Sequence, residues 1–382
     1  MKTRFRSAFM LAAAALMASC ATIPSQTASG LDPEKFVGEY NGKKTALYTL
    51  ENSNGMEVCV TNYGGRIVSV MVPDRNGDFR DVVHGFDNVA NYADKVNTPS
   101  DFGASIGRYA NRINQGRIVV DGQTIQLPQN NFGHCLHGGP DGWQYQVYDA
   151  VQTDKSTIVL TMDSPDGDAN FPGAVTAIVT MTVTDENAID IRYEAVTDKK
   201  TVVNMTNHAY FNLSGDPTHR VDDHLMYINA DCFTPVDDTF MTTGEIIPVE
   251  GTPMDFRQPT PIGQNIKNFD FQQIQFGNGF DHNWCLNTAG DDTQVAARVL
   301  CPETGICLEV LTDEPGVQFY SGNFLDGTCT GKNGTVYQQS TAFCLETQKY
   351  PDSPNKPQWP SAYLEPGQKY TSHCIYRFSV AD

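Results

Sequence analysis

Alternation of apolar and polar residues along the chain predicts β-strands almost throughout. The clearest case covers residues 174–184, where small and β-branched apolar residues alternate with threonines. This period of two is typical of a strand with one buried face. The alternation resumes over residues 189–195 after Asp185-Glu186-Asn187, which predicts an antiparallel hairpin. We expect the buried face of the first strand to consist of Val175, Ala177, Val179, Met181 and Val183.

The remaining pattern predicts an all-β protein. A second hairpin should turn at Asp121-Gly122, and only residues 86–95 suggest a short helix. No alternation of strands with long helices and no glycine-rich phosphate motif occurs, so the class is an antiparallel sandwich or barrel. Without a break in composition, we expect one domain over residues 36–382. Further strands are predicted at residues 56–61, 67–72, 157–162, 295–301, 306–312 and 370–380.

The first twenty residues have the pattern of a bacterial lipoprotein signal peptide. Three cationic residues precede an apolar run over residues 8–18, which is shorter than the ~20 residues of a membrane-spanning helix. The run ends at Leu16-Met17-Ala18-Ser19-Cys20, which resembles a lipobox, so Cys20 is the expected lipidated residue. Plain secretion with cleavage near Cys20 is the alternative. Residues 21–35 are small, polar and proline- and glycine-containing, which predicts a flexible tether.

Charge narrows the range of partners. The formal net charge is −19, and the leader contributes only cations, so the mature chain is still more acidic. Phosphate backbones and anionic lipid surfaces would repel such a protein, which argues against nucleic acid and against membrane contact other than through the lipid. A small neutral ligand suits this surface. We expect an exported monomer, periplasmic or anchored in the outer membrane.

The cysteines indicate little about disulfides or metal sites. Ten occur, and nine remain after Cys20 is set aside, so at least one is not in an intramolecular disulfide. Cys301 and Cys307 flank a predicted turn and could pair. No CxxC motif supports a structural zinc site.

Two segments place polar residues beside apolar ones in a way that indicates a binding site. Asn111 and Arg112 lie within Ile106–Ile113, where a guanidinium could reach into a cleft or form a surface ion pair. His137 is followed by two glycines, which allow backbone to approach a ligand closely. His134 and His137 could also be read as metal ligands, but no third ligand is evident nearby and we assign no metal.

Three further segments carry candidate catalytic and binding groups. The strand Asn204–Leu213 is dense in polar and aromatic residues around His208, and the Tyr210 ring could stack on a sugar. Asp281 and Glu346 each stand beside apolar strand residues, where partial burial would raise the pKa of Glu346 and suit it to act as a general base. Solvated turn carboxylates are the bland alternative. Gln318 is a weaker candidate on the same reasoning.

Taken together and in order, these segments resemble the aldose 1-epimerases, or galactose mutarotases. The resemblance runs from about Phe36 to near the C-terminus and includes the glutamate motif Leu345-Glu346-Thr347-Gln348 and the turn Leu364-Glu365-Pro366-Gly367-Gln368. It implies a large antiparallel twisted β-sandwich, the mutarotase supersandwich, that binds one aldohexose without cofactor or metal. The sequence departs from the residues usual in this family at four positions, which are Ala209, Trp143, Trp284 and Trp359.

The resemblance also implies roles. Glu346 would remove a proton from the anomeric hydroxyl and His208 would protonate the ring oxygen, so that the two anomers of glucose or galactose interconvert. Two alternatives stay open at this point. An inverting glycoside hydrolase would use Asp281 and Glu346 as its two carboxylates, and a non-catalytic sugar-binding protein would need no acid–base pair. The implied sugar-binding residues are Asn111, Arg112, His137, Tyr210, Asp281 and Gln318.

Overall fold

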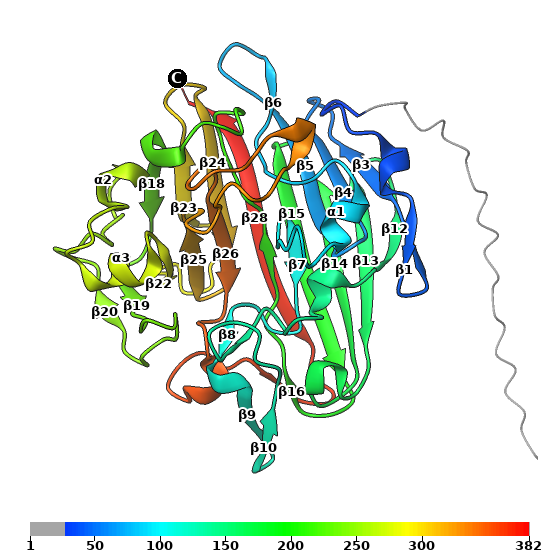
Figure 1. Cartoon of the computed structure of the whole chain (residues 1–382), viewed down its shortest axis with the longest axis vertical. Helices are drawn as coiled ribbons and strands as arrows, with labels where there is room; N and C mark the ends of the chain where they lie inside the picture. Colours follow the sequence, from blue (N-terminus) through cyan, green and yellow to red (C-terminus); the bar gives the residue numbers. More distant parts are fainter. Residues whose placement is uncertain (1–26, 382) are drawn as a thin grey trace, which may run out of the picture.

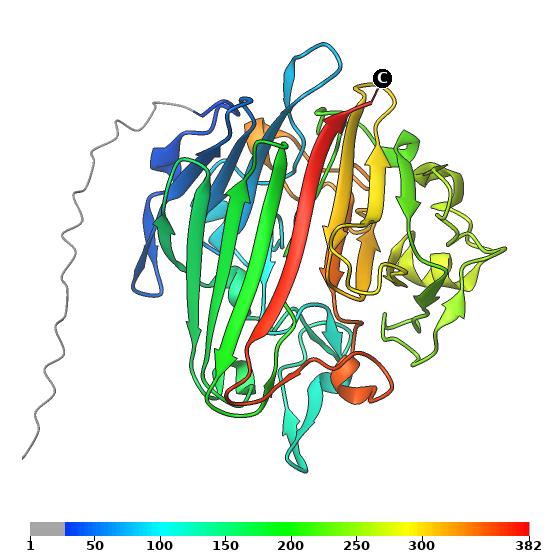
Figure 2. The same ribbon diagram turned by 180° about the vertical axis from the view of Figure 1, so that it is seen from behind.

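A nine-stranded antiparallel sheet runs across the whole molecule and forms one of its two faces (Figures 1 and 2). The computed structural model describes residues 27–381. The longest strand, β28, lies in the middle of this sheet between the hairpin β14–β15 and the pair β23–β24. In order across the sheet the strands are β12 (Asp149–Gln152), β13 (Thr157–Ser164), β14 (Val175–Val183), β15 (Ala188–Thr197), β28 (Tyr370–Val380), β24 (Ile306–Thr312), β23 (Val295–Leu300), β18 (Leu225–Ile228) and β21 (Thr260–Pro261).

Two smaller sheets and several strand pairs form the second layer, seen in front in Figure 1. One sheet is β3 (Leu47–Glu51), β4 (Glu57–Thr61), β5 (Arg66–Pro73) and β6 (Phe79–Asp81). The other is β20 (Ile247–Pro248), β19 (Cys232–Thr234), β22 (Asp281–Cys285), β25 (Gly316–Tyr320) and β26 (Cys344–Gln348). The pairs are β1 (Gly38–Tyr40) with β2 (Lys43–Thr45), β7 (Ala104–Ile106) with β17 (Thr206–His208), β8 (Arg112–Ile113) with β11 (Cys135–Leu136), β9 (Arg117–Val120) with β10 (Gln123–Gln126), and β16 (Thr201–Val202) with β27 (Tyr363–Leu364).

The layers are joined by one large apolar core. Val179 of β14 and Leu308 of β24 belong to the same buried cluster as Val70 of β5, Phe319 of β25 and Leu345 of β26. All five predicted inward residues of β14 are buried, and β14 pairs with β15 as the predicted hairpin. The predicted turn at Asp121-Gly122 joins β9 to β10. The fold class expected from the alternation is therefore confirmed.

The described residues form more α-helices than the sequence predicts. The expected helix at 86–95 is present as α1 (Val89–Ala93), where the Asn88 side chain accepts a hydrogen bond from the Asn91 amide as an N-cap. Two more, α2 (Ile262–Asn265) and α3 (Gln272–Gly277), were not predicted. Each spans less than two turns, which is too short to produce a helical period in the sequence. Within residues 27–381, no helix combines the length and apolar character needed to cross a bilayer.

The suggested disulfide between Cys301 and Cys307 is wrong, because both thiols are free. Cys307 pairs with Leu300 across β23 and β24. Successive residues of a strand point to opposite faces, so Cys301, which follows Leu300, faces the core while Cys307 faces away from it. Cys20 lies outside the described residues.

Residues 21–35 are predicted to be a flexible tether, but the part that the structure describes, residues 27–35, contacts the rest of the protein. The Ala28 amide donates to both carboxylate oxygens of Glu57, at 2.9 and 3.0 Å. Leu31 is buried, and the 3-10 helix η1 (Pro33–Phe36) follows it. A segment of small and polar residues is flexible only when nothing anchors it. Here the Glu57 carboxylate and the buried site of Leu31 anchor the segment. Residues 21–26 lie outside the described residues.

We predict that this N-terminal segment contributes to stability. Leu31→Ala should lower the free energy of unfolding by about 2–5 kcal/mol, because it empties a buried site. Val37→Ala, at a residue that is 62% exposed, is the control and should change it by less than about 0.5 kcal/mol. Denaturant unfolding of the chain from residue 27 onward measures both, and equally small effects would show that the segment is detached in solution.

Candidate active site

A cavity of about 380 Å³ opens in the second layer where the strand pairs β7–β17 and β8–β11 meet β22, β25 and β26. Polar and aromatic side chains line it together, which is typical of a site for a small polar ligand. Seven of the eight predicted site residues line this cavity. Its lining is Pro99, Asp101, Asn111, Arg112, Asn131, Phe132, Leu136, His137, His208, Tyr210, Asp281, Tyr320, Phe324 and Glu346.

His208 and Glu346, 138 positions apart in the sequence, meet in this cavity. His208 is the last residue of β17 and Glu346 the middle residue of β26, and His208 Nε2 lies 3.5 Å from Glu346 Oε1. Both side chains are nearly inaccessible to water, at 7% and 3% exposure. Glu346 Oε2 and His208 Nδ1 have no hydrogen-bond partner among the described residues. Buried polar atoms of this kind normally have partners, so a ligand is the natural one for those that face the cavity.

Strand alternation explains how β26 brings a carboxylate to the site. In the register of β22, β25 and β26, Asn283, Gln318 and Glu346 lie side by side across the sheet. Their neighbours Phe319 and Leu345 point the other way into the main core. One face of this small sheet is therefore apolar and supports the fold, while the other carries the polar groups of the site.

Burial opposes the charge on both members of the pair. It raises the pKa of Glu346 well above its ordinary value, and the neighbouring carboxylates of Asp281 and Asp101 raise this pKa further, whereas Arg112 lowers it. Burial lowers the pKa of His208, and the same two carboxylates act against this change. Burial therefore makes the Glu346 carboxylate a stronger proton acceptor and the protonated His208 a stronger proton donor, which are the properties that an acid–base pair requires.

His137 is held in one tautomer. Its Nδ1 accepts a hydrogen bond from the Asn111 amide at 3.1 Å, so its Nε2 carries the proton in the neutral ring. The His137 ring lies edge-on to His208, with centroids 5.2 Å apart. His134 turns elsewhere, since its Nδ1 accepts from the Gln115 amide and its Nε2 contacts the Thr239 hydroxyl. The two histidines do not form a shared metal-ligand pair; His137 serves as a donor in the cavity.

Arg112 is a buried site residue and not a surface one. Its guanidinium donates two hydrogen bonds to the Asn131 side-chain oxygen, at 2.9 and 3.2 Å, and lies over the Phe240 ring. Asn111 adopts a positive φ of 63°, and its side-chain oxygen accepts a hydrogen bond from the Arg112 amide. Both residues thus reach the cavity from one tightly bonded turn.

Tyr210 and Asp281 line the cavity, and Gln318 supports Asp281. The Tyr210 ring stacks on the His208 ring at 5.0 Å, so at least part of its face orients the histidine. Asp281 lines the cavity and accepts a hydrogen bond from Gln318 Nε2 at 2.7 Å. Gln318 is not among the lining residues, and its visible role is to hold Asp281 in place.

The glycines after His137 allow a close approach within the protein itself. A Cβ on Gly138 would lie 2.3 Å from the Gly107 carbonyl oxygen, and one on Gly139 would lie 3.3 Å from Pro128. Gly138 has a φ of +78°, which disfavours any other residue. The close approach is thus between two backbone segments, and it places His137.

Several lining residues were missed from the sequence. Asp101 is the one carboxylate among them, and Asn131, Phe132 and Phe324 form part of the rim. They lie in loops outside the alternating pattern, and an isolated Ser100-Asp101-Phe102 carries no recognisable signal. Only the cavity itself assembles them.

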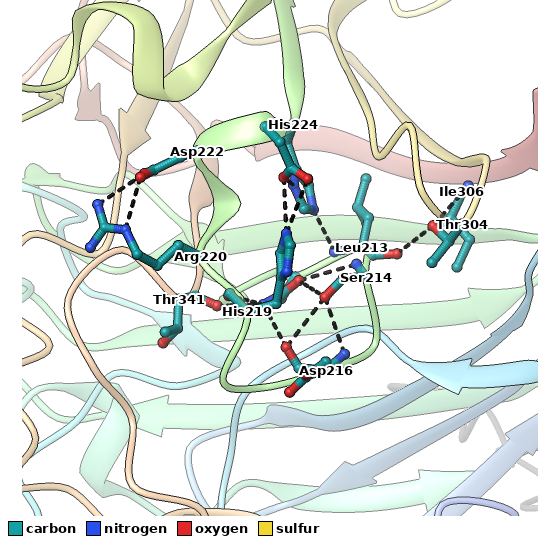
Figure 3. Close-up of polar contacts among 12 residues, drawn as sticks. Leu213, Ser214, Asp216, His219, Arg220, Asp222, His224, Thr304, Ile306 and Thr341 are labelled. Atoms are coloured by element: carbon teal, nitrogen blue, oxygen red, sulfur yellow. Dashed lines mark hydrogen bonds and ion pairs between the residues drawn. The ribbon is translucent and has the colours of Figure 1, made fainter.

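A second histidine–carboxylate cluster lies outside the cavity (Figure 3). His224 Nε2 accepts from the Leu213 amide at 3.1 Å, so its Nδ1 carries the proton and donates to Asp223 at 2.9 Å. His219 Nε2 contacts the same carboxylate at 3.1 Å. The bond from His224 lowers the pKa of Asp223 to about 2. Because the His224 Nδ1 is a donor, this cluster is a hydrogen-bonded tie between loops and not a ready metal site.

Comparison with known proteins points to one family. The sequence model of the aldose 1-epimerase family matches residues 46–377. The chain is 41% identical over 329 residues to the galactose mutarotase of Rattus norvegicus, covering 86% of this chain and 93% of the relative. It is 37% identical over 340 residues to the aldose 1-epimerase of Escherichia coli strain K12, covering 88% and 96%.

Solved structures agree. An aldose epimerase homologue from C. elegans superposes with a TM-score of 0.81 at 30% identity, covering 88% of this chain and all of that one. The galactose 1-epimerase of Lactobacillus acidophilus superposes with a TM-score of 0.79 at 29% identity, covering 90% and 97%. Fold and site together define an acid–base isomerase built on an antiparallel β-sandwich. The chain belongs to the aldose 1-epimerase family, and neither the glycoside hydrolase nor the non-catalytic alternative gains support.

Proposed function

We propose that this protein interconverts the α and β anomers of free hexoses such as glucose and galactose. The observation that carries the proposal is the buried Glu346–His208 pair, 3.5 Å apart in a cavity lined by hydrogen-bonding groups. The names of the relatives, galactose mutarotase and aldose 1-epimerase, support the same reaction.

The pair accounts for the chemistry without another reagent. Glu346 removes the proton of the anomeric hydroxyl while His208 donates a proton to the ring oxygen, and the bond between C1 and the ring oxygen breaks to leave an aldehyde. Rotation about the C1–C2 bond presents the other face of the aldehyde. His208 then takes back the proton from the hydroxyl as it attacks C1, and Glu346 returns its proton to the new anomeric oxygen.

The surrounding groups position the sugar. His137 presents an N–H, Arg112 a guanidinium and Asp281 a carboxylate, so that donors and acceptors both face the cavity. Asn111 completes the set at the turn before β8. Holding the ring so that one oxygen faces Glu346 and the next faces His208 supplies much of the rate enhancement.

Removing either member of the pair should abolish catalysis. We expect Glu346→Gln and His208→Asn each to lower kcat by about 10²–10⁴-fold. The kcat of the double variant should be little lower than that of the less active single variant, because the two groups act as a unit. Polarimetry of fresh α-glucose and α-galactose measures the rate. His219→Asn, outside the cavity, is the control and should retain full activity; a fully active double variant would refute the assigned roles.

The pH profile should respond to Asp281. Activity requires ionised Glu346 and protonated His208, so kcat/KM is bell-shaped and falls below the first pKa and above the second. The Asp281 charge favours the protonated form of both groups. Asp281→Asn should therefore lower both pKa values and move both limbs of the profile to lower pH. Limbs that stay in place or move apart would contradict this electrostatic account.

We also propose that the protein is an exported monomeric lipoprotein whose mature chain begins at an acylated Cys20. The support is the leader pattern of residues 1–20, together with a family match that starts only at residue 46. Thr27 is the first described residue, and the next residue, Ala28, is hydrogen-bonded to Glu57 of the body, so eight residue steps from Cys20 would hold this point within about 29 Å of the lipid.

Metabolic labelling with a palmitate analogue in a bacterial host tests this proposal. The full-length chain should take up the label and fractionate with membranes, whereas Cys20→Ala should lose the label. Cys329→Ala, a half-buried cysteine of the body, is the control and should keep it. An unlabelled, cleaved wild-type chain would favour plain secretion, and the mass of the delipidated protein by sedimentation tests the monomer.

A further inference from the structure

Asp101 is a third carboxylate in the cavity that the reaction described above does not use. It belongs to the loop before β7, where its backbone carbonyl accepts a hydrogen bond from the Ala104 amide. The residue lines the main cavity and also the two clefts that adjoin it. Its Oδ1 atom is buried and has no hydrogen-bond partner among the described residues. A buried carboxylate oxygen without a partner, at the wall of a ligand cavity, indicates a polar contact with the ligand.

The geometry around Asp101 fits one oxygen atom. A carboxylate oxygen of Asp101, a ring nitrogen of His137 and a ring nitrogen of His208 all lie within 4.8 Å of one another. Three groups that each form a hydrogen bond of about 2.8 Å to a single tetrahedral oxygen are about 4.6 Å apart. Asp101 and His137 are therefore close enough together to hold one hydroxyl group beside His208.

The hydrogen-bonding capacity of these side chains favours a hydroxyl group over a metal ion as their ligand. His137 Nδ1 already accepts a hydrogen bond from the Asn111 amide, so the nitrogen left for the cavity carries a proton. A protonated nitrogen cannot ligate a metal, but it can donate to a hydroxyl oxygen. The hydroxyl in turn donates its own proton to Asp101, which only accepts.

We infer that Asp101 and His137, beside His208, bind the C6 hydroxyl of a hexose and make the enzyme selective for sugars that carry it. This inference rests on the proposed function. His208 faces the ring oxygen in that reaction, and a pyranose has carbon neighbours of the ring oxygen only at C1 and C5. Glu346 takes the C1 side, so a hydroxyl held by His137 and Asp101 beside His208 belongs to the C5 substituent. In glucose and galactose this is the C6 hydroxyl, which xylose and 6-deoxy sugars lack.

Selectivity follows because the missing hydroxyl leaves buried groups unpaired. A site built to hydrogen-bond a hydroxyl strongly rejects an analogue without it. With 6-deoxyglucose or 6-deoxygalactose, the Asp101 oxygen stays buried without a partner. We expect the wild-type kcat/KM for each hexose to exceed that for its 6-deoxy analogue by about 10- to 100-fold.

The test compares hexoses with their 6-deoxy analogues in matched variants. Asp101→Ala should lower kcat/KM for glucose and galactose and leave the 6-deoxy sugars nearly unchanged, so that the ratio falls to within about threefold. Asp101→Asn keeps a side-chain acceptor and nearly the same volume, and should give an intermediate ratio. Asp141→Asn removes a carboxylate that lines only the adjoining cleft and is 69% exposed, and should leave the ratio unchanged.

The other outcomes are distinguishable. Equal losses on hexoses and 6-deoxy sugars would show that Asp101 acts only on the fold or on His208, and would overturn the inference while leaving the proposed reaction in place. A wild-type ratio near one would also overturn it. Activity that EDTA removes and Zn²⁺ restores would identify the three side chains as a metal site instead. No mutarotation by the wild-type chain on any sugar would reject the proposed function itself.

Discussion

The rest of the structure depends on one constraint: a carboxylate and an imidazole must be buried next to each other, away from water. Glu346 and His208 come from separate strands, and each is almost completely buried. A buried carboxylate is costly in its ionised form, and a buried imidazole is costly in its protonated form. Placing them 3.5 Å apart allows each charge to stabilise the other, so the state needed for catalysis remains accessible.

The two-layer sheet architecture makes this arrangement rigid. The apolar faces of β25 and β26 are fixed in the common core by Phe319 and Leu345, which leaves their other faces free to carry polar groups. Behind the pair, the Tyr210 ring packs against His208 and Gln318 holds Asp281. Few of the groups that meet the sugar therefore need to be ordered on binding, which is the physical basis of preorganised catalysis.

The strands were predictable from sequence because alternation is a local pattern, whereas the pairing of Glu346 with His208 was implied only by the resemblance to the family. Val175 to Val183 alternate except at Ile178, and Glu346 stands out because apolar residues precede it. The register that sets Gln318 beside Glu346 is a long-range property, so the hydrogen bond from Gln318 to Asp281 could not be predicted from the sequence. Asp101 lies in a loop with no periodic pattern and acquires meaning only beside His137 and His208.

The central claim is that one pyranose lies between Glu346 and His208 with its anomeric oxygen at the carboxylate and its ring oxygen at the imidazole. A crystal structure of the protein with a bound hexose tests this claim most directly. We predict that the anomeric oxygen lies about 2.6–3.2 Å from a Glu346 oxygen and the ring oxygen at a similar distance from His208 Nε2. A sugar bound in this cavity with its anomeric carbon turned away from both groups would contradict the account.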